Sequence, residues 1–300
     1  MQHNDPEQII NEIRTDRRNG AAALALRGLD FLEATAAQLS SKPEEAEQQA
    51  NEAVRILGEI RPSIGAIGVQ AVVALSRARG LVSEGMSWKM ALLRAVQSER
   101  QISGQANASI AELAKQEIGV GGVIVTCSWS MTVLAALQVL KPTRVIIGDG
   151  HPLGDGASAA NWIAARGMEV HLLPDAAVAA SVNGARAVII GADQILADGS
   201  VVNRTSSFCL ALSAGYFGVP FYVLCQRTKL SGIGPFDLPM DETHATPSDI
   251  PSGVTYRGPL FEITPPELIT AVLTESGSMN PRQAGEVGQG LERIKEQILG

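Results

Sequence analysis

Several features that mark metal, membrane or nucleic-acid proteins are scarce in this sequence. It has only three cysteines in 300 residues, Cys127, Cys209 and Cys225, and no C-x-x-C pair, so a structural zinc site is not expected. The apolar runs fall well short of the roughly 20 residues that a membrane span requires. The formal net charge of −7 argues against direct binding of nucleic acid or an anionic membrane. The odd cysteine count and the lack of an apolar leader favour a reducing, cytoplasmic setting.

Aromatic residues are also few, at 4% of the chain, whereas 45% of residues are hydrophobic. A core built from Ala, Val, Ile and Leu favours helices packed on buried parallel strands over a β-sandwich. The sequence contains neither a Walker P-loop nor a G-x-G-x-x-G fingerprint after a strand, which argues against a nucleotide hydrolase or an NAD enzyme. No cofactor is therefore predicted.

Two domains are expected from the change in hydrophobic pattern along the chain. Residues 5 to about 115 read as successive helices, and the capping residue Asp5 followed by Pro6 begins the first of them. From Gly119 onward, short β-branched runs alternate with helical segments. We therefore predict a helical domain over residues 1–118 and a Rossmann-like, doubly wound parallel α/β domain over residues 119–300 with a helical tail.

The expected strands place most of the reactive side chains at one edge of the sheet. The predicted strands are Val123–Thr126, Arg144–Ile147, Glu169–Leu172, Ala187–Ile190, Pro220–Leu224 and Leu260–Ile263, and a helix is predicted over Pro266–Thr274. Right-handed crossovers put the carboxyl ends of parallel strands on one edge, where open α/β sheets bind ligands. The loops that follow the strands are thus the candidate site.

The loop after the first strand carries hydroxyl groups at the start of a helix. Ser128 and Ser130 precede that helix, and free backbone N–H groups at a helix N-terminus suit a phosphate. Simple N-capping by either serine explains the pattern equally well. Cys127 is a nucleophile only if its surroundings lower its pKa, and a small apolar residue is ordinary at the end of a buried strand, so we favour a structural role.

Further candidates follow the later strands. Asp193, after an apolar strand, has the position of a general acid or base, although capping of the next turn is the simpler role for a single carboxylate. Asn203 and Arg204 follow a turn, and Arg204 is a candidate phosphate clamp, or a solvated surface residue. His151 either contacts an anion or caps its turn.

The helical region contributes a second set of candidates. Arg17, Gly20 and Ala21 combine cationic charge with small residues at a helix start, which allows close approach of an anion. Arg61 before a proline is another cationic candidate, and Lys229 completes the predicted ligand-binding residues.

One segment resembles the signature of a known family. Residues 191–204, GADQILADGSVVNR, closely resemble the pattern GAD-x-[IV]-x-x-[ND]-G-x-[VA]-x-N-K. This pattern belongs to the superfamily that unites the alpha, beta and delta subunits of translation initiation factor 2B with methylthioribose-1-phosphate and ribose-1,5-bisphosphate isomerases. The segments 61–63, 218–223 and 264–275 are similar to other parts of the family, so the resemblance covers nearly the whole chain.

The resemblance implies a fold and a chemistry. It implies a helical domain, a Rossmann-like domain, assembly into a homodimer or homo-oligomer, and a small phosphorylated ligand. In the isomerases a cysteine and an aspartate open an aldose 1-phosphate ring to give a ketose, and Asp193 matches that aspartate. Ser128 occupies the place of the cysteine, and Cys127 lies one residue earlier, which turns its side chain to the other face of the strand. Arg204 replaces the signature lysine, and His151 stands where the family has arginine.

Three hypotheses follow. The first is a binding or regulatory protein of the factor 2B type that holds a sugar phosphate or nucleotide, and the replacements at residues 128 and 151 favour it. The second is a sugar-phosphate isomerase that uses Asp193, with Cys127 and Ser128 as the other candidate catalytic residues. The third, a purely structural subunit, would not need Asp193, Arg204 and a cluster of hydroxyl groups at one edge.

Overall fold

The computed structural model describes residues 5–16, 21–61, 65–151, 153–235, 250–255 and 259–299. The chain divides into two compact units. The helical unit comprises Met1–Gln105, Thr228–Ile233 and Val287–Gly300, and the sheet unit comprises Ala106–Arg227 and Gly234–Glu286. Each unit is described by itself.

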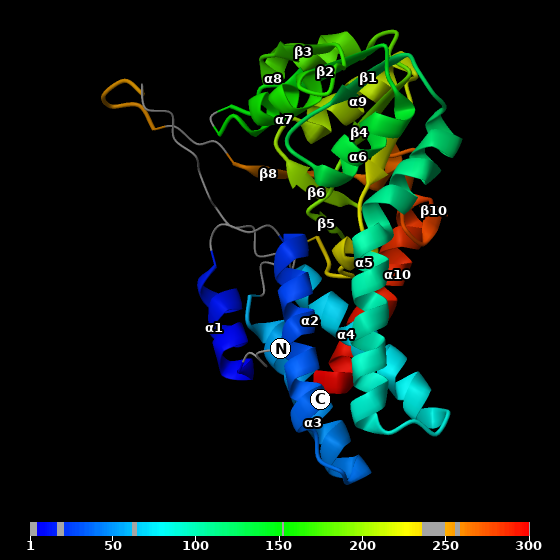
Figure 1. Cartoon of the computed structure of the whole chain (residues 1–300). Helices are drawn as coiled ribbons and strands as arrows, with labels where there is room; N and C mark the ends of the chain where they lie inside the picture. The colour runs from blue at the N-terminus through cyan, green and yellow to red at the C-terminus, as the bar shows by residue number, and fades with distance from the viewer. Residues whose placement is uncertain are drawn as a thin grey trace. The chain divides into compact units, whose positions relative to one another are not determined.

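Helices drawn in blue to cyan make up most of the helical unit (Figure 1). They are α1 (Pro6–Thr15), α2 (Ala21–Gln38), α3 (Pro43–Glu59), α4 (Gly65–Ser83) and the first part of α5 (Trp88–Ile118), and the end of α10 (Pro281–Leu299) belongs to the same unit. Asp5 caps α1 by accepting a hydrogen bond from the backbone N–H of Glu7, as its position before a proline predicts.

The core of the helical unit is centred on α4. By length and composition α4 is long and apolar enough to cross a membrane, yet it is largely buried by its neighbours α2 and α3. Ile67 and Leu75 of α4 are almost completely buried, and full burial of such a side chain contributes about 1.5–3 kcal/mol. The apolar character of α4 is therefore that of a core helix.

A seven-stranded sheet organises the sheet unit, in the order β10-β9-β7-β4-β1-β2-β3. The strands are β1 (Val123–Thr126), β2 (Arg144–Gly148), β3 (Val170–Leu173), β4 (Ala187–Ile190), β7 (Phe221–Leu224), β9 (Ala271–Thr274) and β10 (Gly277–Met279). All neighbouring pairs are parallel except β9 and β10. The strand order reverses direction at β1 and β4, which is the switch point where open α/β sheets bind ligands.

Helices cover both faces of this sheet, as Figure 1 shows for α6, α7 and α9. Ile124 and Ile189 belong to the apolar core shared with the end of α5, with α6 (Met131–Leu140) and with α7 (Asp155–Ala164). Their neighbours along the strands, Val125 and Val188, point to the other face because side chains alternate along a strand. On that face α8 (Asp175–Val178) contacts β2, and α9 (Ser207–Phe217) contacts β4 and β7. The fold is the predicted doubly wound α/β architecture.

The last two predicted elements differ from the structure. Strand β8 (Phe261–Thr264) lies in a separate antiparallel sheet, in the order β5-β6-β8, with β5 (Gln194–Ile195) and β6 (Val201–Arg204). The predicted helix over Pro266–Thr274 is wrong. The short 3-10 helix η3 (Pro266–Leu268) is followed by β9, because Val272 and Leu273 are completely buried in register beside β7.

Candidate functional site

A cavity of about 520 Å³ opens at the carboxyl ends of β1, β2 and β3 within the sheet unit. Its volume falls in the range of small-molecule sites. Loops after β1 and β2, the start of α7, helix α8 and the turn after it, the end of β6, the start of α9, and β8 with the residues before it supply the lining. The lining residues are Ser128, Gly150, His151, Asp155, Asp175, Ala176, Ala179, Arg204, Thr205, Ser206, Cys209, Pro259, Leu260 and Glu262. The site thus lies at the predicted edge of the sheet.

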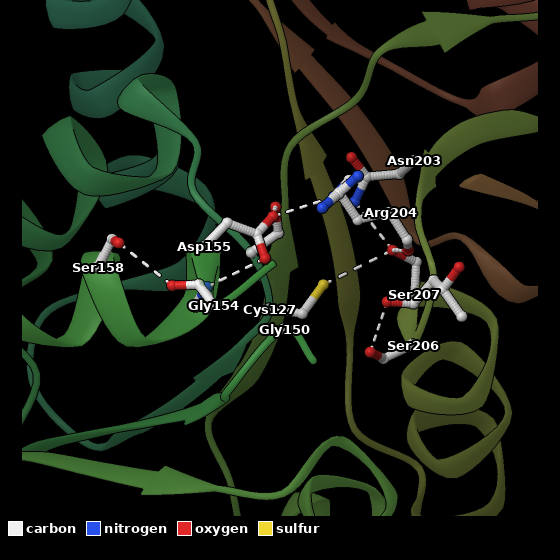
Figure 2. Close-up of polar contacts among 12 residues, drawn as sticks. Cys127, Gly150, Gly154, Asp155, Ser158, Asn203, Arg204, Ser206 and Ser207 are labelled. Carbon is white, nitrogen blue, oxygen red and sulfur yellow. Dashed lines mark hydrogen bonds and ion pairs between the residues drawn. The ribbon is translucent and has the colours of Figure 1, made fainter. Parts of the chain in front are cut away.

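An ion pair between α7 and β6 crosses the cavity. The Nε of Arg204 donates to Oδ2 of Asp155 at 2.9 Å, and the hydroxyl of Ser128 donates to the same oxygen at 2.8 Å. Figure 2 shows Asp155 and Arg204 pointing toward each other from their separate elements. About a fifth of each side chain remains accessible, 17% for Arg204 and 21% for Asp155. This pair fixes the position of the only arginine in the described lining.

Glycines beside the cavity allow close packing between the backbone and the acidic side chains. A Cβ at residue 156 would lie 1.8 Å from the carbonyl oxygen of Gly148, which no side chain tolerates. Gly150 has a φ of +71°, and a Cβ there would lie 2.0 Å from Oδ1 of Asp155. The acidic side chains can therefore approach the main chain closely.

Asp175, at the start of α8, accepts hydrogen bonds from three neutral donors among the described residues. The backbone N–H groups of Gly150 and His151 donate to it at 3.3 and 3.0 Å, and the Ser206 hydroxyl donates at 3.1 Å. Burial raises the pKa of this carboxyl above its ordinary value, and its hydrogen bonds only partly offset that effect.

Glu262 of β8 occupies the N-terminus of α9. Its Oε1 accepts from the backbone N–H of Phe208 at 2.8 Å, and the backbone N–H groups of Ser206 and Ser207 also contribute. Burial nevertheless raises the pKa of Glu262. A helix N-terminus is a ready anion site, and here a carboxylate of the chain itself fills it.

Two serines of the lining have strained backbones. Ser128 has a φ of +63° and Ser206 a φ of +93°, a region that non-glycine residues rarely adopt. Each such residue costs on the order of 1–3 kcal/mol and persists only when its surroundings hold it. The hydrogen bonds of Ser128 to Asp155 and of Ser206 to Asp175 hold both.

Cys127 is not among the residues that line the cavity. It is 2% exposed, its Sγ lies 3.6 Å from the hydroxyl of Ser207, and burial raises the pKa of the thiol to about 12. Asn203, also buried, donates to the same hydroxyl at 2.8 Å, as Figure 2 shows. Both residues support the start of α9, consistent with the structural role that we favour for Cys127.

The structure brings three predicted residues, Ser128, His151 and Arg204, to this one cavity. Asp193 is exposed after β4, its backbone N–H pairs with Val202, and it is not among the described residues that line the cavity. Ser130 is also not in that lining. It caps α6 by accepting from the backbone N–H of Val133 at 3.4 Å.

The remaining predicted residues belong to the helical unit. Arg17 and Gly20 lie outside the described residues, and Ala21 is the first residue of α2. Arg61 donates to the backbone carbonyl of Asp16 at 2.6 Å. Lys229 ends the 3-10 helix η2 (Arg227–Lys229). Their part in ligand binding stays a prediction.

Sequence reasoning missed three acidic residues of the cavity, Asp155, Asp175 and Glu262. Asp175 follows β3 and obeys the same strand-end rule that located the other loops. Asp155 gave no specific signal, because acidic residues are common in the first turn of a helix. Glu262 could not be placed, because the antiparallel sheet that turns it toward α9 was not anticipated. Within the described part of the chain, no three His, Cys, Asp or Glu side chains gather as metal ligands would.

The fold and this cavity define an α/β protein with a small-molecule site at the carboxyl edge of its parallel sheet. A model of the initiation factor 2 subunit family matches residues 17–281. The chain belongs to this family.

The similar proteins include both initiation-factor-like proteins and isomerases. A Pyrococcus abyssi protein described as translation initiation factor eIF-2B subunit 2-like is 29% identical over 91% of this chain and 96% of its own. A methylthioribose-1-phosphate isomerase of Exiguobacterium sibiricum is 30% identical over 91% of this chain and 85% of its own. A chain of the tetrameric eIF2B-beta2-delta2 complex from C. thermophilum has a TM-score of 0.73 at 20% identity, covering 95% of this chain and 94% of its own. This last likeness shows the fold alone.

Proposed function

We propose that this protein is a binding or regulatory protein of the factor 2B type that holds a small phosphorylated ligand, a sugar phosphate or a nucleotide, and that it does not isomerise it. The observation that supports the proposal is that residues 127 and 128 provide no activated nucleophile. The thiol next to the place of the isomerase cysteine in the sequence is that of Cys127, which is buried beside Ser207 with its pKa raised to about 12. A thiol with such a pKa is almost entirely protonated near neutral pH and is a poor nucleophile.

Ser128 does not replace the missing thiol. Its hydroxyl faces the cavity but donates to Asp155, a carboxylate already paired with Arg204. A serine needs a base that takes its proton, and the carboxylate of Asp155 is already engaged by the guanidinium group of Arg204. The arrangement positions a hydroxyl for binding and provides no activated nucleophile.

Turnover and binding can be measured on the same sample. Methylthioribose 1-phosphate and ribose 1,5-bisphosphate are incubated with the protein, and ketose formation is followed by NMR, with an active methylthioribose-1-phosphate isomerase as positive control. We expect saturable binding by calorimetry for a sugar phosphate or for AMP, and no ketose. Ketose formation that is lost in Asp193→Asn would refute the proposal and establish the isomerase alternative.

The proposal extends to self-association. The family includes proteins that assemble, as the tetrameric eIF2B-beta2-delta2 complex does. We expect this chain to form a homodimer or a larger homo-oligomer at micromolar concentration. Sedimentation velocity would show a mass at least twice the chain mass of 31.5 kDa, whereas a monomer throughout the concentration series would contradict this part.

A further inference from the structure

The charged groups of the cavity oppose entry of an anion. Its described lining contains three carboxylates, Asp155, Asp175 and Glu262, against one arginine, Arg204. Counting these four groups alone, one positive and three negative charges give a formal charge of −2. The guanidinium group is moreover engaged by Asp155 at 2.9 Å, so its charge is compensated within the protein.

The neutral donors that would bind a phosphate are also occupied. The N-terminus of α9 donates to Glu262, and the backbone N–H groups of residues 150 and 151 donate to Asp175. Helix N-termini and successive backbone N–H groups are the usual phosphate-binding elements of such sheets. Here each of the two elements already holds an anion that belongs to the chain.

Asp175 and Glu262 lie on either side of Ser206 and form no ion pair with any described residue. The Ser206 hydroxyl donates to Asp175, and its backbone N–H contributes to Glu262. A cationic group that enters the cavity would meet both carboxylates, whereas an added phosphate would face them without a compensating cation.

We propose that this cavity selects positively charged groups, such as an ammonium, and excludes phosphate. The inference rests on the proposed function in placing the ligand in this cavity. The cationic or hydroxylated part of the ligand enters it, and any phosphate that the ligand carries stays outside, held by other residues. A carboxyl that keeps its proton lowers the negative charge of the site but supplies no positive charge for a phosphate.

Cys209 is a built-in reporter of this selectivity. It lines the cavity and is exposed, while Cys127 and Cys225 are each 2% exposed. The full-length protein is treated with three methanethiosulfonates that carry an ethyltrimethylammonium, a methyl or an ethylsulfonate group. Their rates are divided by the corresponding rates with 2-mercaptoethanol. Cys209→Ser gives the background.

We expect the cationic reagent to react at least about tenfold faster than the anionic one after this correction, because acidic clefts concentrate cations. Glu262→Gln, alone and combined with Asp175→Asn, reduces the preference in steps. The control Glu267→Gln removes a carboxylate from an exposed position outside the lining, and it leaves the preference for the cationic reagent unchanged. Inorganic phosphate at about 20 mM, with ionic strength matched by chloride to equalise screening, does not slow the neutral reagent.

Equal rates for the two charged reagents, or a faster anionic one, would overturn the inference. So would protection of Cys209 by phosphate. The wild-type ratio decides the matter even if the double variant fails to fold. These rates do not depend on turnover, so discovery of isomerase activity would refute the proposed function and leave the charge selectivity standing.

Discussion

The ion pair between Asp155 and Arg204 should contribute measurably to folding, because it is neither fully buried nor fully exposed. At 2.9 Å and an effective dielectric constant of about 20, the Coulomb energy of two unit charges is roughly 6 kcal/mol. Desolvation and screening cancel most of it: exposed pairs contribute about 0.2–1 kcal/mol, while breaking a buried pair costs about 3–5 kcal/mol. With about a fifth of each side chain exposed, we expect Arg204→Met and Asp155→Asn each to cost about 2 kcal/mol.

A double-mutant cycle isolates the interaction. The double variant should lose less than the sum of the single variants, with a coupling energy of about 1.5 kcal/mol. Urea denaturation followed by circular dichroism gives the free energies. The pair Arg144–Glu169 on the same unit is the matched control, because its side chains are 41% and 50% exposed and its coupling should stay below about 0.5 kcal/mol. A coupling at residues 155 and 204 no larger than in the control would refute the reasoning about the site.

Three further predictions concern the close packing at Gly156, the titration of Glu262 and the accessibility of residue 128. Gly156→Ala should cost about 3 kcal/mol or more in urea denaturation, since its Cβ meets a carbonyl oxygen at 1.8 Å, whereas Gly80→Ala, with open space inside α4, should stabilise by about 0.5–1 kcal/mol. Equal effects would contradict the close approach. Burial raises the pKa of Glu262, so this carboxyl keeps its proton to a higher pH in the folded protein than in the unfolded protein. The stability that this difference provides is lost as pH rises from 4.5 through the folded pKa. The melting temperature of Glu262→Gln minus that of wild type should therefore increase from about pH 4.5 to about pH 8, and a falling difference would reverse the assigned sign. Finally, Ser128→Cys in the Cys209→Ser background should become alkylated, as mass spectrometry would show, while Cys209→Ser alone stays unmodified; labelling of both would mean that the native buried thiols are accessible.

The sequence was sufficient for the elements whose pattern is local. The strands Val123–Thr126 and Ala187–Ile190 are observed with the predicted ends, because an unbroken run of apolar, mostly β-branched residues between turn signals indicates a buried parallel strand. The cap at Asp5 is likewise a local feature. These predictions needed no knowledge of the rest of the chain.

The features that could not be predicted from the sequence depend on contacts with segments distant along the chain. The segment Ala271–Thr274 forms a strand because β7 offers it an edge, and nothing within the segment distinguishes that outcome from a helix. In the same way Glu262 faces α9 only because β8 pairs with β6 in a second sheet. The candidate phosphate clamp Arg204 is paired with Asp155, and the N-terminus of α9 holds Glu262; both acidic side chains arrive from other elements, so the local sequence does not reveal these contacts.

The glycines beside the cavity and the small or apolar residues that line it differ in the room they leave for a larger side chain. At Gly148 and Gly156 an added Cβ would collide with Asp175 or with the main chain, so no larger residue fits at either position without a shift of its surroundings. Ala176, Ala179 and Leu260 line the same cavity with small or apolar side chains. Substitution of these three residues would therefore change the surface that a ligand meets.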